Sequence, residues 1–379
     1  MEKLITLLLF LIAITLLVSN TGCDTKSQAA SLGYQISEKG DKITFIFDEK
    51  TQNQTLVTKI HVAGSFSSWD ISDYWVLEQS GTKGVWILTV PVKIVNIPGN
   101  SGYPEFKFVV NGSKWINSIA PAGYQFTGNT LIVYPGDDIE QIITNEKIAK
   151  TIKKLDEFDL TKEKDKKIIA NFRLVPGTDK LFRSYHPFKK SRLFDTENPR
   201  IEMINELMES NSVQSIISLS EREKPQNDGE LSAYLKNIFD HNHVLFVDSS
   251  YDTVYYQSDS SDFANQIKKI VEFIIDPEHQ APFLVHCRIG TDRTGVVSAV
   301  LAAFCGASWD SICADYQKSN DMGIDEFRDY KLLQYSFENM LKMKIDENIN
   351  LKIAVSKYFT NEGYLSSEQI EALNQKLKN

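Results

Sequence analysis

The hydrophobic pattern of this 379-residue chain changes its period near residue 136. Before that point apolar and polar residues alternate, as in Ile43–Phe47 and Glu105–Val110. Alternation of this kind is typical of strands with one buried face. After that point apolar residues recur at helical spacing, at Ile148, Ile152 and Leu155. The chain therefore predicts an all-β domain followed by a domain of another class, and its length is enough for two or three domains.

The first domain contains four of the five tryptophans, all within the stretch from Trp69 to Trp115. Asn111-Gly112, between two alternating runs, indicates a β-hairpin. Short strands separated by turn residues predict a β-sandwich over residues 41–136. We expect Trp75 and Trp86 to fill its core.

Residues 137–166 form the predicted linker, and strands and helices alternate from about residue 167 to the end. The predicted strands are Ser212–Ser218, His243–Asp248 and Phe283–His286, and the predicted helices are Pro199–Glu209, Ala264–Ile275 and Val296–Cys305. This order predicts an α/β domain over residues 167–379, with helices on the faces of a central sheet.

The N-terminal residues have the pattern of a targeting sequence. Leu4–Val18 is an apolar run of 15 residues, which suits a signal sequence and is shorter than the roughly 20 residues of a spanning helix. The small residues before Cys23 resemble a bacterial lipobox, so residues 1–23 are predicted to form a signal peptide with Cys23 as the lipidation site. Residues 24–40 are then a tether. The alternative is an uncleaved N-terminal anchor, and either arrangement predicts attachment to an envelope membrane, on its periplasmic or extracellular side.

Composition excludes several classes of function. Lys and Arg number 41 against 50 Asp and Glu, a net charge of −9, so a general nucleic-acid partner is not expected. The four cysteines and six histidines show no zinc-ligand spacing, so we expect no structural metal. Cys305 and Cys313 are predicted to be buried, inert thiols, with a disulfide between them as the alternative.

One loop concentrates the residues that suit chemistry. It runs from Cys287 to Gly295, after a predicted strand and before an apolar helix. Such a loop can direct consecutive N–H groups and the positive helix end toward an anion, and a cysteine in that field becomes a nucleophile. We expect phosphate to be bound by Arg288, Ile289, Gly290, Thr291, Asp292 and Arg293, with Gly290 allowing the turn and Arg293 donating a two-pronged hydrogen bond.

His286-Cys287-x-x-Gly290-x-x-Arg293-Thr294-Gly295 resembles the signature of cysteine-based protein tyrosine and dual-specificity phosphatases. Three further stretches are similar to the bacterial branch of that family with an Asp-Arg-Thr-Gly motif, namely Asn171–Arg173, Leu181–Ser184 and Asp315–Asn320. The resemblance covers most of residues 167–379. It implies hydrolysis of phosphate monoesters through a phosphocysteine, with no metal and no cofactor.

The resemblance also assigns roles. Cys287 would be the nucleophile and Arg293 would bind the phosphoryl group. Thr294 would assist the leaving thiolate or orient water, and His286 would hold the loop by hydrogen bonds. The family takes its general acid from an upstream loop, which favours Asp252, 35 residues before the cysteine, with Asp248 and Asp292 as alternatives.

The predicted sandwich resembles the glycogen-binding module of the AMP-activated kinase β-subunit, an immunoglobulin-like early-set domain. The similar stretches are Gly64–Trp69, Phe106–Trp115 and Gly128–Val133. The resemblance implies that Trp69 and Trp115 stack on sugar rings while Lys107 and Asn129 bond hydroxyl groups; the alternative is that the two tryptophans belong to the core.

The leading hypothesis is therefore an envelope-tethered cysteine phosphatase with a glucan-module-like domain. Its substrate would be a phosphorylated protein, lipid or glycan, and α-glucan is a further expected partner. One alternative is a phosphoglucan or phosphoinositide phosphatase directed by the module. The other is an inactive carbohydrate-binding lipoprotein.

Overall fold

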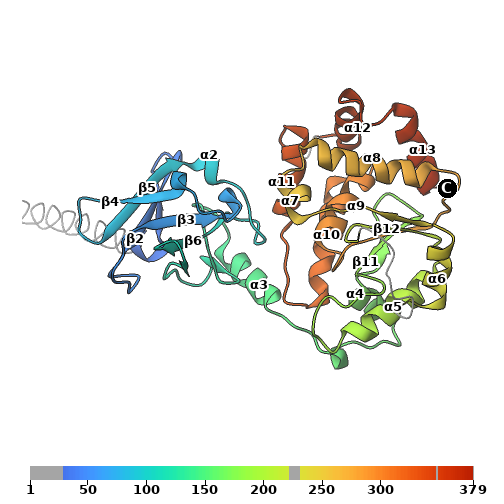
Figure 1. The fold of residues 1–379 in the computed structure, drawn as a ribbon, viewed down its shortest axis with the longest axis horizontal. Coiled ribbons are helices and arrows are strands. Elements are labelled where there is room, and N and C mark those ends of the chain that lie inside the picture. The colour runs from blue at the N-terminus through green and yellow to red at the C-terminus, as the bar shows by residue number, and fades with distance from the viewer. Residues whose placement is uncertain (1–28, 222–230, 347–348, 379) are drawn as a thin grey trace, which may run out of the picture. The chain divides into compact units, whose positions relative to one another are not determined.

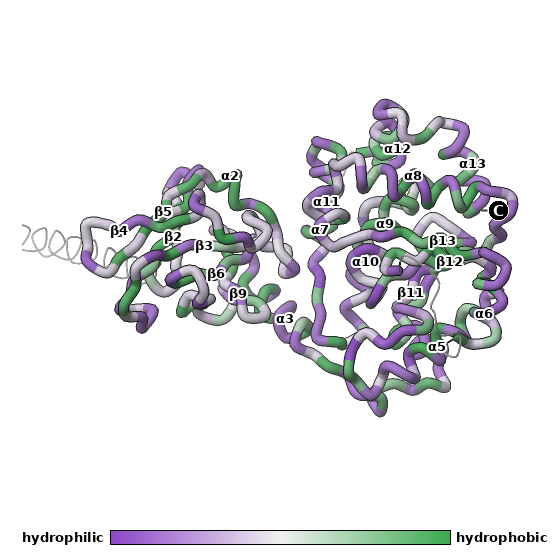
Figure 2. The backbone as a smooth tube through the Cα atoms, in the orientation of Figure 1, coloured by the Kyte–Doolittle hydropathy of each residue, from purple (hydrophilic) through white to green (hydrophobic). Residues whose placement is uncertain are grey.

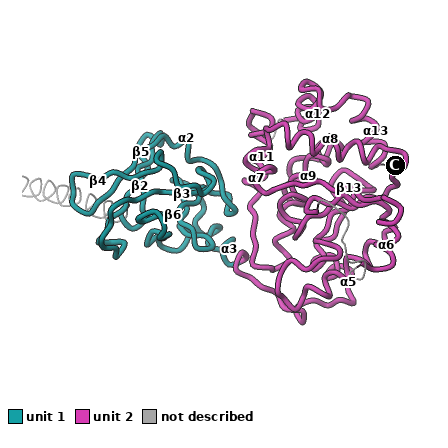
Figure 3. Tube along the Cα trace, in the orientation of Figure 1, with its two compact units in different colours: residues 1–147 teal, residues 148–379 magenta. Residues whose placement is uncertain are grey.

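A computed structural model describes residues 29–221, 231–346 and 349–378. These residues divide into two compact units, with the boundary between Lys147 and Ile148 (Figure 3). That boundary lies inside the stretch predicted as a linker, within helix α3 (Ile139–Ala149). Cys23 and the predicted signal peptide lie outside the described residues. No helix in the described part of the chain is both long and apolar enough to cross a membrane.

Unit 1 is a curled antiparallel sheet (Figure 1). Its strands are β1 (Tyr34–Ile36), β2 (Lys42–Asp48), β3 (Ile60–Gly64), β4 (Val76–Gln79), β5 (Val85–Pro91), β6 (Glu105–Val110), β7 (Lys114–Ile116), β8 (Gln125–Phe126) and β9 (Asn129–Leu131). The order is β1-β2-β5-β4-β3-β6-β9-β8, and β7 also pairs with β6. Because β4 pairs with β3 through its first half and with β5 through its second half, the sheet curves around its core. The antiparallel β-class is confirmed, whereas the immunoglobulin-like sandwich stays a prediction.

Alternation along the strands builds the core of unit 1. Phe45 and Phe47 of β2 point inward and meet Phe106 and Phe108 of β6 edge-on, with 5.2 Å between ring centroids in each pair. Trp75 and Trp86 are buried in the same core, as expected. Asn111 and Gly112 both have positive φ between β6 and β7, which confirms the predicted hairpin.

The sheet begins earlier in the chain than the sequence pattern suggests. Strand β1 lies within residues 24–40, the predicted tether, and pairs with β2. The Tyr34 hydroxyl accepts a hydrogen bond of 2.8 Å from the Val133 amide. Alternation over only three residues is too short to stand out in a sequence.

Unit 2 is built on a five-stranded sheet. Its strands are β10 (Arg173–Leu174), β11 (Leu181–Ser184), β12 (Ser215–Ser218), β13 (Val244–Phe246) and β14 (Phe283–His286). The order is β10-β11-β14-β12-β13, antiparallel only between β10 and β11. β14 is the central strand, and its predicted bounds are confirmed. Parallel strands need helical crossovers, so the α/β class is confirmed as well.

Helices cover both faces of this sheet (Figure 1). They are α4 (Glu163–Ala170), α5 (Glu197–Ser210), α6 (Ala233–Asp240), α7 (Tyr251–Tyr255), α8 (Ser261–Ile275), α9 (Asp292–Phe304), α10 (Trp309–Gln317), α11 (Tyr330–Leu341), α12 (Leu351–Asn361) and α13 (Ser367–Lys378). Along β14, Phe283 and Val285 face the core formed with α8 and α9, whereas Leu284 faces the core formed with α5 and α6.

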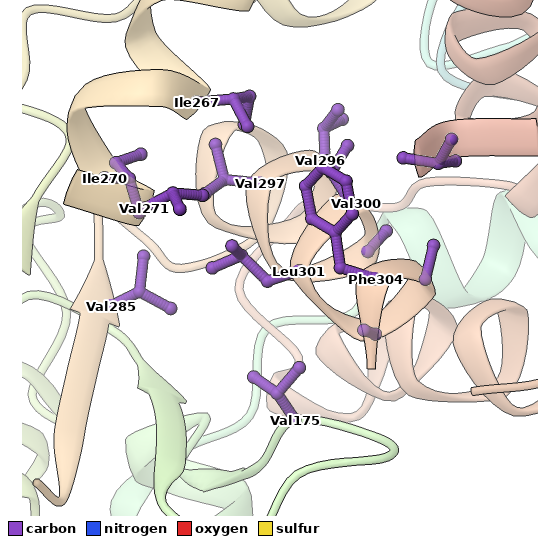
Figure 4. Packing of buried hydrophobic residues seen from close by; sticks show 14 of the residues in the cluster. Val175, Ile267, Ile270, Val271, Val285, Val296, Val297, Val300, Leu301 and Phe304 are labelled. Carbon is purple, nitrogen blue, oxygen red and sulfur yellow. The ribbon is translucent and has the colours of Figure 1, made fainter. Parts of the chain in front are cut away.

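Helix α9 is buried on every side. Residues 294–304 are all buried, and hydrophobic segments run along α9 in Figure 2. Figure 4 shows Val297 and Leu301 of α9 among Val271 of α8, Val285 of β14 and Val175. An all-round apolar helix belongs in a domain centre. The loop that joins β14 to α9 is therefore anchored at both ends by buried elements of unit 2.

Candidate active site

The loop from Cys287 to Asp292 turns its carbonyl groups outward. Four consecutive carbonyl oxygens, those of residues 287–290, each accept a hydrogen bond from a side chain outside the loop's concave face. The pairs are His286 Nδ1 with Cys287 O (3.2 Å), Ser191 Oγ with Arg288 O (2.8 Å), Asn171 Nδ2 with Ile289 O (3.2 Å) and Arg183 Nη2 with Gly290 O (2.7 Å). In a trans peptide the following N–H points the opposite way. The amides of residues 288–291 consequently face the concave side, where they can bind an anion together with the N-terminus of α9.

Gly290 is required by this geometry. Its φ is +74°, and a Cβ there would collide with the carbonyl oxygen of Ser184 on β11. A side chain at this position would therefore need both a left-handed backbone and a displaced strand.

The three family-like stretches meet behind the loop. Arg173 Nε and Arg183 Nη1 each donate to a different carboxylate oxygen of Asp315, both at 2.6 Å. Burial alone would raise the pKa of Asp315, but the charges of Arg183 and Arg173 lower it below its ordinary value. Asn171, next to Arg173, completes the network through Ser319. Two members of this network, Asn171 and Arg183, donate the hydrogen bonds to the carbonyls of Ile289 and Gly290.

A pocket of about 220 Å³ opens above the loop. It is lined by Arg192, Ser249, Ser250, Tyr251, Cys287, Arg288, Ile289, Asp292, Arg293 and Glu326. The Cys287 side chain is almost fully buried in the pocket floor. Arg293 Nη1 donates to the carbonyls of Leu219 (2.9 Å) and Ser249 (3.3 Å). Loops after β12 and β13 thus hold the guanidinium at the site, and within the described residues Nε and Nη2 have no recorded protein partner.

Asp292 is held in an ion pair. Arg328 Nε lies 2.6 Å from Oδ1 and Nη2 lies 3.2 Å from Oδ2, and the Tyr255 hydroxyl donates to Oδ1 at 3.1 Å. Burial would lower the pKa of Arg328, but the charges of Asp292 and Glu326 raise it well above its ordinary value. Asp292 is therefore fixed as part of the pocket wall.

The three candidate general acids occupy different places. Asp292 lines the Cys287 pocket. Asp252 is exposed on α7, and Asp248 is exposed after β13, where it lines a neighbouring cavity of about 760 Å³. Neither Asp252 nor Asp248 is among the residues that line the Cys287 pocket. Which of the three donates the proton stays a prediction.

His286 is buried beside the loop. Because a carbonyl only accepts, its Nδ1 carries the proton in the hydrogen bond to Cys287. Burial lowers the pKa of His286 to about 3, so the ring is neutral at pH 7. Its Nε2 has no recorded partner in the described part of the chain. This geometry fits a positioning role for His286.

His186 and Glu221 lie next to His286, with candidate ligand atoms of the three within 4.8 Å. Amides of Phe188 and Lys189 donate to His186 Nδ1, so Nε2 holds the proton and donates to Glu221 at 2.6 Å. Burial opposes ionisation of Glu221, but the hydrogen bond from His186 brings its pKa below the ordinary range. A metal at Nε2 would require this ring to lose its last proton, so the cluster does not fit a metal site.

Three other predicted residues are placed as follows. Thr294 is fully buried at the start of α9, and its hydroxyl has no recorded partner within the described residues. Thr291 is also buried, and its hydroxyl likewise has no recorded partner among the described residues. Arg288 is exposed and donates to the Ser191 carbonyl at 2.9 Å.

Several residues of the pocket could not be recognised from the sequence. They are Arg192, Ser249, Ser250, Tyr251 and Glu326, together with Arg328 behind Asp292. They come from segments far apart in the chain, and no local spacing marks them. Three of them, Arg192, Glu326 and Arg328, are joined by ion pairs that exist only in the folded chain.

In unit 1, the four residues predicted to bind sugar lie together. The rings of Trp69 and Trp115 are 6.4 Å apart at 45°, and Trp115 is 42% exposed. Trp115 is opposite Val109, which shares a strand face with Lys107 and Glu105. Asn129 Nδ2 donates to Glu105 at 2.6 Å. The amide nitrogen of Asn129 is therefore engaged inside the protein, while Trp115 is exposed and Trp69 is half-buried.

Comparisons with known proteins bear on unit 2. The profile of the "Tyrosine phosphatase family" matches residues 223–379, which include the Cys287 loop. A search of curated proteins finds no match. Similar solved structures include the core catalytic domain of the PP-IP phosphatase SIW14 from S. cerevisiae in complex with citrate, at 19% identity and a TM-score of 0.30, covering 52% of this chain and 94% of that one. A structure of the Siw14 catalytic core has 16% identity and a TM-score of 0.29, covering 52% and 93%.

The profile match covers the segment that contains the Cys287 loop, and it supports a cysteine-based phosphatase domain in unit 2.

Proposed function

We propose that this chain is a metal-independent phosphate-monoester hydrolase that works through a phosphocysteine. The observation that carries this proposal is the loop geometry, in which four carbonyls point outward and Cys287 shares a pocket with Arg293. The profile match over residues 223–379 supports it. A tyrosine or dual-specificity phosphatase is the finer form of the proposal.

In the first step the Cys287 thiolate attacks phosphorus. A P–S bond forms as the P–O bond to the leaving group breaks, and the leaving oxygen takes a proton from a carboxylic acid. Inward-facing amides and Arg293 bind the three non-bridging oxygens, whose charge they stabilise in the transition state.

In the second step water attacks phosphorus. The P–S bond breaks and the electron pair returns to Cys287. The carboxylate left by the first step takes a proton from the water, and inorganic phosphate is released. The buried hydroxyl of Thr294, which has no recorded partner within the described residues, would donate to the departing thiolate. Neither step requires a metal ion.

The test is phosphate release from an aryl phosphate at mildly acidic pH with EDTA present. We expect turnover by the wild type, none by Cys287→Ser, and a loss of at least about 100-fold in Arg293→Lys, since lysine cannot form the two-pronged contact. Turnover that requires added metal, or that survives in Cys287→Ser, would contradict the proposal.

The general acid can be assigned with the same assay. Removing it slows esters with poor leaving groups more than those with good ones, because only the former need protonation. Asp292→Asn, Asp252→Asn and Asp248→Asn are compared on phenyl phosphate and on 4-nitrophenyl phosphate. Asp292 lines the Cys287 pocket but both of its carboxylate oxygens are paired with Arg328. We therefore expect Asp252, the residue that the sequence favours, to show the larger selective loss.

For unit 1 we propose α-glucan binding, supported by the neighbouring rings of Trp69, which is half-buried, and Trp115, which is exposed. Planar rings of this kind bind the apolar faces of sugars. Retention on immobilised glycogen should fall at least about tenfold in Trp69→Ala and Trp115→Ala. Tyr74→Ala, which removes an aromatic ring that is 62% exposed, is the matched control. No retention of the wild type would exclude a glucan-directed phosphatase.

We also propose that the chain is exported and attached to an envelope membrane through Cys23, as the sequence predicts. Cys23→Ser should abolish incorporation of labelled fatty acid and release the protein from membranes. Incorporation that is unchanged in this variant would exclude lipidation at Cys23.

A further inference from the structure

An ion pair on the wall of the Cys287 pocket joins two residues that the reaction above does not use. Arg192 Nη2 donates to Glu326 Oε1, and the side chains are 22% and 21% exposed. Glu326 Oε2 also accepts from Arg328 at 2.7 Å, and Arg328 holds Asp292. Arg192 is therefore the outermost member of a charge chain that ends in the catalytic loop.

The backbone beneath Arg192 is fixed in place. The amides of Ser191 and Arg192 donate to Glu197 Oε2 at 2.7 and 3.1 Å, and Glu197 is almost fully buried against Tyr185. Ser191 exchanges two hydrogen bonds with Arg288 of the loop, at 2.8 and 2.9 Å. These contacts tie the segment that contains Arg192 to the loop that binds the phosphoryl group, so the distance between the two cannot vary freely.

The charges at the pocket exceed what one phosphoryl group needs. Three guanidinium groups line it, those of Arg192, Arg288 and Arg293, against the carboxylates of Asp292 and Glu326. Both carboxylates are already paired with Arg328. In a chain with a net charge of −9, this local excess of positive charge marks an anion site.

We propose that Arg192 forms a second anion subsite, for a phosphoryl group adjacent to the one that Cys287 attacks. The proposal rests on the proposed phosphatase function and specifies its substrate class. Glu326 occupies the subsite when no ligand is present, because it supplies the carboxylate that a phosphoryl group would replace. A second phosphoryl group would accept two charge-assisted hydrogen bonds from the Arg192 guanidinium. Glu326 would keep its contact with Arg328.

The pocket dimensions agree with this class of ligand. At about 220 Å³ it is smaller than the roughly 300–1,000 Å³ typical of sites that enclose whole drug-sized molecules. Among the described residues that line it, Tyr251 is the one with an aromatic side chain. A compact, highly charged group thus fits the lining better than an extended apolar one.

The test compares inorganic pyrophosphate with inorganic phosphate in two ways. Each is used as a competitive inhibitor of aryl phosphate hydrolysis by the wild type. The binding of each to the Cys287→Ser variant, which hydrolyses no ester, is also measured by calorimetry. The wild type should bind pyrophosphate more tightly. In Arg192→Ala that preference should fall about tenfold, the effect of losing a charge-assisted contact. In Glu326→Gln, which removes the competing charge and keeps the shape, the preference should rise.

Lys190→Ala is the matched control. Lys190 is exposed, lies two residues from Arg192 and does not line the pocket. An equal loss of preference in Lys190→Ala and Arg192→Ala would overturn the subsite, because it would show a general field effect. An unchanged preference in Arg192→Ala, with circular dichroism showing a folded protein, would overturn it too.

Two further substrates separate free from membrane-bound ligands of the same chemistry. Phosphate release is measured from soluble inositol bisphosphate and from vesicles containing phosphatidylinositol bisphosphate. If phosphate release from one of these substrates falls in Arg192→Ala but not in Lys190→Ala, the result supports the subsite. It also shows whether the ligand is soluble or membrane-bound. Binding data from the Cys287→Ser protein remain decisive if no variant hydrolyses any ester, so failure of the proposed activity is distinguishable from failure of the subsite.

Discussion

At the scale of single residues, the three cysteines in the described part of the chain are all free thiols in different surroundings. Burial raises the pKa of Cys305 to about 11 and that of Cys313 to about 12. Both therefore stay protonated at neutral pH and are poor nucleophiles. Cys287 instead lines the pocket that it shares with Arg293.

This difference predicts selective alkylation. Protein that begins after Cys23 should react with iodoacetamide at pH 7 at one site, Cys287, with Cys305 and Cys313 modified only on unfolding. Mass spectrometry of digested protein locates the label. Inorganic phosphate should slow the reaction, and Cys287→Ser should abolish it. Rapid labelling of Cys305 or Cys313 in folded protein would contradict the burial described above.

His286 predicts a pH dependence of stability. Its pKa is lowered from the ordinary 6.5 to about 3, so between these values the unfolded chain binds a proton that the folded chain does not. Stability must then fall as pH falls from 6.5 toward 3, by about 1.4 kcal/mol per pH unit from this group. Urea unfolding at several pH values should show a shallower dependence in His286→Gln. Exposed His241→Gln is the control, and equal slopes in all three proteins would contradict the prediction.

At the scale of elements, the catalytic loop depends on a network that joins β10, β11 and α10. Asp315 of α10 is the shared partner of Arg173 and Arg183. Asp315→Asn leaves two buried guanidinium groups without a charge partner, and we expect the free energy of unfolding to fall by about 3–5 kcal/mol. We expect kcat to fall as well, since Arg183 also holds Gly290. Exposed Asp310→Asn on α10 is the control. Wild-type stability and kcat in Asp315→Asn would show that the loop does not need this network.

The elements that the sequence predicted well are those with strong local patterns. The bounds of β6 and β14 were predicted correctly, because apolar side chains line these buried strands. Helix α9 begins at Asp292 rather than at Val296 because residues 292–295, the end of the Cys287 motif, form its first turn. Helical spacing also failed at Ile152, which forms a β-bridge with Ile324. Strands β10 and β11 exist through pairing with each other and with β14, which no local pattern encodes.

The same reasoning explains which parts of the site could be predicted. Cys287, Gly290 and Arg293 occupy one loop, so their spacing is visible in the sequence. Arg192 and Glu326 become neighbours only in the folded chain. A motif can therefore predict the chemistry of this site, whereas the residues that set its specificity required the structure.

At the scale of the whole molecule, each unit has its own core. The core of unit 1 centres on the phenylalanines of β2 and β6, and unit 2 has a core on each face of its sheet. Separate cores favour separate cooperative unfolding. A ligand that binds one unit would then stabilise that unit alone.

Differential scanning calorimetry of the chain without residues 1–28 tests this. We expect two unfolding transitions. Inorganic phosphate at 100 times its dissociation constant should stabilise only the transition of unit 2, by about 2.7 kcal/mol. If Trp69 and Trp115 bind glucan, maltoheptaose should raise the midpoint temperature of the unit 1 transition alone. Phe108→Ala in the core of unit 1 should lower the free energy of unfolding of unit 1 by about 3–5 kcal/mol. One transition that moves as a whole with either ligand would show instead that the two units unfold together, and glucan binding could then alter the stability of the Cys287 loop.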